Sequence, residues 1–123
     1  MAASTIPFKL ITPTKVVFEG DAELVIAVTT EGEEGFLPSH APFLGALKPG
    51  VLRANVVSEG KSTRLELALG EGFVQALPDR ITILADRALS FDDIDVAATR
   101  EELAQATDQA DIDFANAKLR LVS

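Results

Sequence analysis

The sequence predicts a mainly β protein with added α structure: an N-terminal antiparallel β-sandwich followed by a C-terminal helical hairpin. Short extended segments alternate with turn residues from Phe8 to Ala85, the pattern of an all-β sandwich or barrel. Gly and Pro are absent after Asp86. The stretch from Asp92 to Ser123 is rich in Ala, Leu, Asp, Glu and Gln, which is helical composition. We therefore place the sandwich at residues 1–88 and a short helical hairpin at residues 89–123.

Seven segments carry the extended pattern. It is cleanest at Thr63–Leu69, where three leucines fall on one face and Arg64, Glu66 and Ala68 fall on the other. One face of that strand is therefore expected in the core and the other in water or lightly covered. The other six segments are Phe8–Thr12, Val16–Glu19, Glu23–Thr29, Val51–Val57, Phe73–Leu77 and Arg80–Leu84.

Turn residues separate these segments. Gly allows a positive φ and Pro presets φ, so short runs that contain them favour hairpin turns. We expect such turns at Glu19–Asp21, Lys48–Gly50, Ser58–Lys61 and Leu77–Arg80.

The helical tail is predicted to contain two helices. Asp92 or Asp93 can N-cap the first, and Lys118 and Arg120 fall in the last turn, where cations suit the helix dipole. The apolar stripe changes phase between Thr107 and Asp111, which indicates a break. The segment from Asp92 onward contains 8 acidic and 3 basic residues, and the apolar side of each predicted helix consists mostly of Ala. We therefore expect the hairpin to dock loosely on the sandwich.

Composition excludes several classes of protein. The chain has 123 residues, 11 basic against 19 acidic, with a net charge of −8, which disfavours nucleic acids and anionic membrane surfaces as partners. The absence of Cys removes disulfides, thiolate nucleophiles and Cys-based metal sites, and one histidine cannot build a multi-His site. No signal peptide pattern and no membrane-spanning run is present, so a soluble, unprocessed protein is expected.

The chain is unusually apolar for one so acidic. Hydrophobic residues make up 47% of it and the mean hydropathy is +0.22. Two interpretations stay open: aliphatic residues fill a small core, or part of this surface is buried against a partner.

Candidate catalytic residues are few. Ser39 and His40 are adjacent, and adjacent side chains point apart, so they do not suggest a nucleophile and its base. His40 is expected to be hydrogen-bonded in a Pro-bounded loop. The pair Asp111 and Asp113 starts like a calcium-binding EF-hand loop, but the required Gly and the final Glu are missing.

Two glycine-bracketed segments carry other weak signals. Glu31, Glu33 and Glu34 could hold a hard cation or act as paired carboxylates, but a solvated or partner-facing acidic loop is the simpler interpretation. The run Gly70–Gly72 is a fragment of a phosphate-binding fingerprint with no helix behind it. We interpret it as a β-bulge or a tight strand crossing.

One long string is specific enough to suggest a family. Residues 30–50 read TEGEEGFLPSHAPFLGALKPG, which closely resembles the epsilon subunits of F-type ATP synthases, the counterparts of the mitochondrial delta subunits. Supporting matches stand in the same order and cover most of residues 8 to 95. They are FKLITP from Phe8, VFEG from Val17, GEGFV from Gly70 and ITILADRA from Ile81.

The resemblance implies a function without an active site or cofactor of its own. In this family a β-sandwich binds the gamma subunit of the rotating central stalk and stands on the membrane c-ring, and a helical hairpin follows. It implies a peripheral position on the cytoplasmic face of the bacterial inner membrane and a role in coupling proton flow to ATP synthesis. Contact of the helices with the alpha and beta subunits, with weak regulation of ATP hydrolysis, is a further role that the resemblance allows.

The resemblance also assigns contact residues. Glu31, Glu33 and Glu34 match the acidic loop that faces the c-ring, whose loops are basic in the family. The segment that lies near gamma is matched by other residues of the long string. They are Ser39, His40 and Pro42.

Two departures concern the tail. Some members bind ATP through an Ile/Leu-Asp-x-x-Arg-Ala motif; here Ile94 and Asp95 are present, but Arg100 comes two positions late, so weak or no ATP binding is expected. The tail is also short, and Lys118 and Arg120 are the only bases in its second helix. We therefore expect it to stay folded on the sandwich rather than reach the catalytic head.

Two functions from other classes compete with a rotor subunit. One is a small-ligand-binding β-sandwich with a regulatory helical tail. The other is an acidic β-fold hydrolase that uses Glu33, Glu34 and His40. Either would need convergent polar residues on adjacent strands, whereas the sequence gathers them in one loop only. The apolar excess without a catalytic set favours the rotor subunit.

Overall fold

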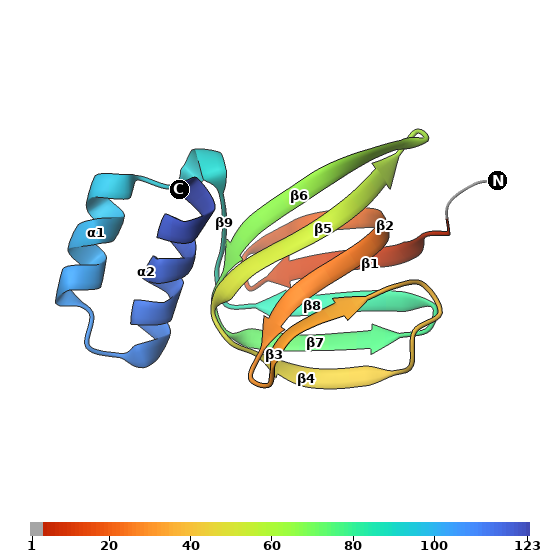
Figure 1. Ribbon diagram of the computed structural model, residues 1–123, viewed down its shortest axis with the longest axis horizontal. Coiled ribbons are helices and arrows are strands. Elements are labelled where there is room, and N and C mark those ends of the chain that lie inside the picture. The colour runs from red at the N-terminus through yellow and green to blue at the C-terminus, as the bar shows by residue number, and fades with distance from the viewer. Residues whose placement is uncertain (1–3) are drawn as a thin grey trace.

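The computed structural model describes residues 4–123. Strands make up most of this part of the chain, and two helices follow at its C-terminal end (Figure 1). The strands are β1 (Ile6–Thr12), β2 (Lys15–Thr29), β3 (Gly32–Phe36), β4 (Phe43–Leu47), β5 (Gly50–Ser58), β6 (Lys61–Leu69), β7 (Gly72–Leu77), β8 (Arg80–Ala85) and β9 (Ala88–Ser90). A 3₁₀ turn, η1 (Phe91–Asp93), leads into α1 (Val96–Gln105) and α2 (Gln109–Val122). The predicted order of sandwich and helical hairpin is confirmed.

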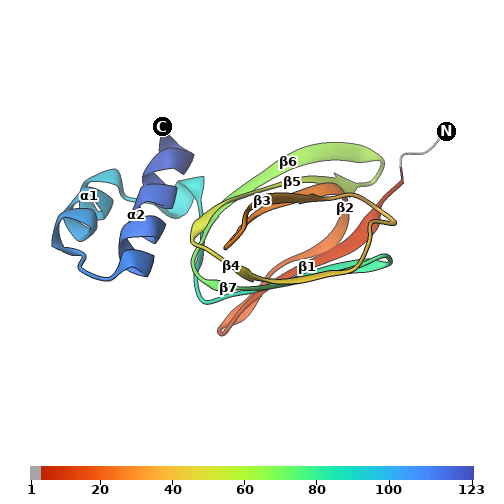
Figure 2. The ribbon, with the colours of Figure 1, turned by 60° about the horizontal axis from the view of Figure 1, so that its bottom comes forward.

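The strands form two layers that share β2 (Figure 2). The N-terminal half of β2 pairs with β1, and β8, β7 and β4 continue this first layer. The C-terminal half of β2 pairs with β3 and β5, and β6 and β9 continue the second layer. All these pairs are antiparallel except β1 with β8, which is parallel.

The core lies between the layers because alternate side chains of each strand point inward. Phe8 and Leu10 of β1 meet Ile81 and Ile83 of β8 there, all at most 1% exposed. The predicted inward face of the Thr63–Leu69 segment is confirmed, since its three leucines belong to or pack against this core.

The predicted turn at Glu19–Asp21 is wrong, because β2 runs through it without a break. Gly20 and Asp21 pair with Phe8 and Pro7 of β1. The Gly leaves room for the ring of Phe18, whose Cζ would lie 3.1 Å from an added Cβ. The glycine therefore serves packing and not a turn.

Two of the other three predicted turns are hairpins, and the third is not. Ser58–Lys61 and Leu77–Arg80 join paired neighbours and are hairpins as predicted, with φ of 53° at Glu59 and 78° at Gly60. Lys48–Gly50 is not a hairpin turn, because it carries the chain from β4 in the first layer to β5 in the second. A Cβ at Gly50 would overlap the side chain of Val28, so glycine permits this passage.

The run Gly70–Gly72 is the tight strand crossing that the sequence suggested. It carries the chain from β6 to β7, and backbone hydrogen bonds tie it to the segment after β8: Gly70 N donates to Arg87 O at 2.9 Å and Asp86 N donates to Glu71 O at 2.8 Å. A Cβ at Gly72 would overlap the carbonyl oxygen of Leu84. The two strands can approach this closely only because residue 72 has no side chain.

The helical hairpin breaks between Gln105 and Gln109, which overlaps the predicted phase change between Thr107 and Asp111. The predicted cap at Asp92 or Asp93 is wrong, because both lie in η1; Asp95 caps α1 by accepting from Ala98 N at 3.1 Å. The second helix is capped by Asp108. Within residues 4–123 the structure contains no helix long and apolar enough to cross a membrane.

Only one helix of the hairpin forms the main contact with the sandwich. The ring of Phe114 on α2 packs with Ala117 against Ala68 of β6. The helix α1 packs on α2, and the Nζ of Lys118 donates to the Glu102 carboxylate at 2.6 Å. Docking of α1 therefore depends on α2.

Candidate functional site

The three glutamates predicted to face a partner lie at one end of an edge strand. Glu31 is in the turn after β2, and Glu33 and Glu34 belong to β3, which pairs with β2 alone. The expected loop is thus a short hairpin, because Phe36 of β3 enters the core and orders the strand. Thr29 Oγ1 fixes the turn by donating to Gly32 O at 2.8 Å and accepting from Glu31 N at 3.1 Å.

The glutamates differ in their surroundings. The carboxylate of Glu33 is ion-paired with the guanidinium of Arg53 on β5. Glu34 points to the other face of the edge strand and is half-buried. Within residues 4–123, Glu31 and Glu34 form no ion pair. A surface pair such as Glu33 with Arg53 contributes about 1 kcal/mol or less, but it removes one charge from the acidic edge.

Ser39, His40 and Pro42 lie in the loop between β3 and β4, at the opposite end of the same edge. Ser39 has φ of 65° and its N–H donates to Pro78 O at 3.3 Å. His40 Nδ1 lies 2.6 Å from Ala41 O, and its ring meets Phe36 edge-on with centroids 5.5 Å apart. The five-residue strand, about 17 Å long, separates Glu31 from this loop, whereas Glu34 lies at its middle.

The residues at this edge form neither a ligand-binding site nor the catalytic site of a hydrolase, the two alternative functions. Ser39 and His40 make no hydrogen bond to each other within the described chain, and His40 Nε2 is buried without a partner. Glu33 and His40 lie at opposite ends of β3. Among the described residues there is no group of three or more His, Cys, Asp or Glu that could hold a metal ion.

An apolar row crosses the outer face of the first layer, and sequence reasoning missed it. Cross-strand pairing places its members side by side on five strands. Phe73 is 60% exposed, Leu84 and Val16 are 49% exposed, and Leu44 beside the row is 75% exposed. We name these residues the apolar row: Ala46, Phe73, Leu84, Ile11 and Val16.

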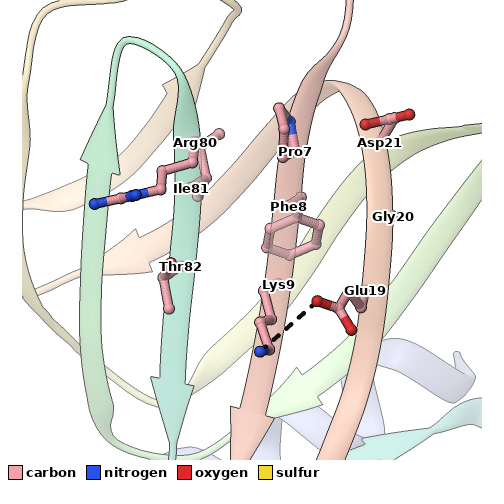
Figure 3. A pocket seen from close by; sticks show the side chains of 9 residues that line it. All are labelled: Pro7, Phe8, Lys9, Glu19, Gly20, Asp21, Arg80, Ile81 and Thr82. Atoms are coloured by element: carbon pink, nitrogen blue, oxygen red, sulfur yellow. Dashed lines mark ion pairs between the residues drawn. The ribbon is translucent and has the colours of Figure 1, made fainter.

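A polar band borders the apolar row on β1 and β8, where the pair Lys9 and Thr82 lies two residues from the pair Ile11 and Leu84. Lys9 and Glu19 form an ion pair at 3.7 Å beside a hollow of about 380 Å³ over β1, β2 and β8. The guanidinium of Arg80 points toward β7, away from that pair, as Figure 3 shows. An exposed apolar centre with a polar border is the anatomy of a protein–protein interface.

The acidic turn adjoins one end of the apolar row. Thr30 N donates to Ala46 O at 3.0 Å, and Thr29 pairs with Leu47 of β4. Glu31 therefore lies next to the Ala46 end. Part of the signal is present in the sequence, because Phe73 and Leu84 are large apolar residues at outward positions of their strands. The order of the strands, which brings them together, is not.

The structure does not bring the predicted nucleotide residues together. The carboxylate of Asp95 caps α1, and its carbonyl accepts from Thr99 Oγ1 at 2.7 Å. Arg100 is exposed five positions later, which is about 140° around a helix axis. Ile94, before the cap, is half-buried.

Taken together, these features define a class: a small β-sandwich protein with an exposed apolar face and an acidic edge, which is the anatomy of a protein that binds other proteins. Residues 5–91 match the family described as ATP synthase, Delta/Epsilon chain, beta-sandwich domain. The chain therefore belongs to the ATP synthase delta/epsilon chain family, as the string at residues 30–50 suggested.

Curated relatives agree over most of their length. The ATP synthase epsilon chain of Halalkalibacterium halodurans is 38% identical over an alignment of 123 positions that covers 95% of this chain and 90% of the relative. That of Chromobacterium violaceum is 38% identical over 100 residues, which cover 81% of this chain and 70% of the relative.

Solved structures share the fold. A chain of the Euglena gracilis mitochondrial ATP synthase, described as OSCP/F1/c-ring, matches with a TM-score of 0.66 at 20% identity over 99% of this chain and 79% of that one. A chain of the Tetrahymena thermophila central stalk and c-ring matches with a TM-score of 0.64 at 20% identity over 99% and 94%.

Proposed function

We propose that this chain is the central-stalk, or rotor, subunit of a proton-translocating F-type ATP synthase. It links the gamma subunit to the membrane c-ring and so couples proton flow to ATP synthesis, as a non-catalytic part of the complex. It lies on the cytoplasmic face of the bacterial inner membrane and is peripheral through the complex. The observation that carries the proposal is the apolar row, which supplies a binding face to a protein of net charge −8.

The gamma subunit covers the apolar row in this proposal. Burial of apolar surface gains about 25 cal/mol per Å², and Phe73, Leu84 and Leu44 are large apolar side chains exposed on this face. Leu44 on β4 is exposed and lies two residues after Pro42, so the row extends along β4 toward the loop of Ser39, His40 and Pro42 that the family resemblance assigned to gamma.

The acidic edge faces the c-ring in this proposal. Carboxylates that meet basic loops fix orientation and raise the rate of association more than they raise affinity. Glu31 and Glu34 are the stronger candidates, because Glu33 shares its charge with Arg53. The position of Glu31 next to the Ala46 end of the apolar row lets the same small sandwich contact both partners.

The hairpin has a minor role in this proposal. Residues 1–88 contact gamma and the c-ring, and residues 89–123 stay folded on them, with at most weak regulation of ATP hydrolysis through the alpha and beta subunits. Phe114 and Lys118, buried between the helices and the sandwich, support the folded state. Nucleotides bind weakly or not at all, since Asp95 is engaged as a cap.

Co-elution with gamma tests the main proposal. The purified chain is expected to form a one-to-one complex with an ATP synthase gamma subunit on a sizing column. Phe73→Ser and Leu84→Ser should each weaken the complex about 30-fold, because buried aromatic and aliphatic anchors contribute about 2 kcal/mol or more. Phe91→Ser is the matched control, since Phe91 is 59% exposed outside this face. A chain that stays monomeric beside folded gamma would remove the main support for the proposal.

Charge reversal tests the acidic edge. In reconstituted vesicles, the double variant Glu33→Lys with Glu34→Lys is expected to uncouple proton flow from ATP synthesis, because lysines would repel basic c-ring loops. Glu59→Lys, at the β5–β6 turn, is the control and should couple normally. Unchanged coupling in the double variant would refute the assignment of this edge.

A further inference from the structure

A hollow opens at the end of the apolar row nearest the strand crossing. Its volume is about 350 Å³. Phe73 and Leu84 are paired across β7 and β8, and Ile11 of β1 pairs with Leu84 on the other side, so three apolar side chains form its wall. Pro13 lines it from the turn after β1, and Gly72 lies beside Phe73 without a side chain to fill it.

Two carboxylates stand at the border of this hollow, and the better placed is Glu71. It precedes Gly72 in the crossing, where Asp86 N holds its carbonyl at 2.8 Å. Glu71 is exposed and forms no ion pair within residues 4–123. Asp86 also lines the hollow and lies 3.8 Å from Arg87 Nε.

The charge of Arg87, which pairs with Asp86 at this border, is shared with other groups. The guanidinium of Arg87 lies 4.2 Å from the centroid of the Phe114 ring and 3.2 Å from the Asp111 carboxylate. Both contacts draw its charge toward the helical hairpin. The border of the hollow at Glu71 is therefore negative.

An apolar trough that ends at a free carboxylate is complementary to a long basic side chain. Lysine and arginine lay an apolar stem on apolar surface and keep the charged head at a polar edge. The exposed face of Phe73 adds attraction, because an aromatic face draws a cation within about 6 Å. Neither a fully apolar nor an acidic side chain would satisfy both ends.

We propose that this hollow receives a lysine or arginine side chain of the gamma subunit, with its stem on Phe73 and Leu84 and its charge at Glu71. The inference rests on the proposed function, since the hollow continues the face assigned to gamma. In this proposal the basic side chain is the anchor that fixes the position of gamma along the apolar row.

Calorimetric titration of the full chain with gamma at 50 mM and 300 mM salt tests the inference. Glu71→Gln is expected to raise Kd about tenfold at low salt, since a lost charge-assisted hydrogen bond costs at least that much, and to make Kd less dependent on salt. Phe73→Leu keeps an apolar wall but loses the aromatic face, so a Kd about threefold higher is expected. Glu59→Gln removes an equal charge at the far turn and should leave Kd unchanged.

The outcomes separate the two proposals. If the unchanged chain binds gamma but Glu71→Gln binds it with the same Kd at both salt concentrations, the basic anchor is refuted and the rotor assignment stands. If Glu59→Gln weakens binding as much as Glu71→Gln, the effect is one of net charge and the site is refuted. If the unchanged chain does not bind gamma, both proposals fall. Circular dichroism of each variant checks that the exposed substitutions leave the sandwich folded.

Discussion

Replacement of Gly72 by alanine is expected to lower the free energy of unfolding by about 4 kcal/mol or more. The added Cβ would overlap the carbonyl oxygen of Leu84 and the Cα of Ala85, which are backbone atoms and cannot rotate away. Relief requires that β7 move away from β8, and this breaks the pairing at Gly72 and Ala85. Since small domains are stable by about 5 to 15 kcal/mol, much of the protein would be unfolded.

Urea unfolding followed by circular dichroism measures this effect. Gly35→Ala is a matched control on β3, where an added Cβ would make ordinary contacts at 3.7 Å with Leu24 and 3.8 Å with Ile26. Its free energy of unfolding should change by about 0.5 kcal/mol or less. If both variants unfold at the same urea concentration, the crossing is less tight than described.

Phe114→Ala is expected to release the helical hairpin while the sandwich stays folded. The ring is 4% exposed and lies close to two cations, with Arg87 Cζ at 4.2 Å and Lys118 Nζ at 5.1 Å from its centroid. Truncation of a buried Phe costs about 3 to 5 kcal/mol, and this ring is the largest apolar side chain of the cluster that joins α2 to the sandwich. The side chain of Lys118, only 8% exposed, would also lose its aromatic neighbour.

Hydrogen exchange locates the change. Amides of α1 and α2 should exchange at least tenfold faster in Phe114→Ala, whereas those of β7 and β8 should keep their protection. Asn116→Ala changes an exposed residue of the same helix and should leave the exchange rates of both helices unchanged. Equal slowing or acceleration in sandwich and hairpin would mean that the two parts unfold as one unit.

The parts of the fold predicted correctly are those determined within a few residues. Alternation in Thr63–Leu69 identifies the inward leucines because a strand has period two. Ser58–Lys61 and Leu77–Arg80 form hairpins because their turn residues suit a two-residue loop. The loss of Gly and Pro after Asp86 marks the helical tail, since both disfavour helices.

The errors come from contacts between distant segments. Gly20 has the composition of a turn, but its role is to accommodate the ring of Phe18 within a continuous strand. Turn chemistry at Lys48–Gly50 does not reveal that the next strand belongs to the other layer. Three aspartates precede α1, and only the position of the Ala98 amide distinguishes Asp95 as the cap.

The candidate surfaces divide in the same way. The acidic edge and the loop at Ser39 and His40 were found from a contiguous string of residues. The apolar row could not be found in this way, because Val16 and Phe73 share a face only through the pairing of β1, β2, β7 and β8. A single sequence shows that apolar residues are in excess but does not show where they meet.

The parallel pairing of β1 with β8 has a consequence for folding. Phe8 near the start of the chain pairs with Ile81, so the first layer cannot close until almost all of the sandwich has been synthesised. Contacts between such distant residues slow folding. Until then β1 is paired with β2 on one side only and presents an open edge, which favours association with other chains. During synthesis the emerging chain is therefore most prone to aggregation before β8 emerges, and the hairpin that follows docks on a sandwich already closed.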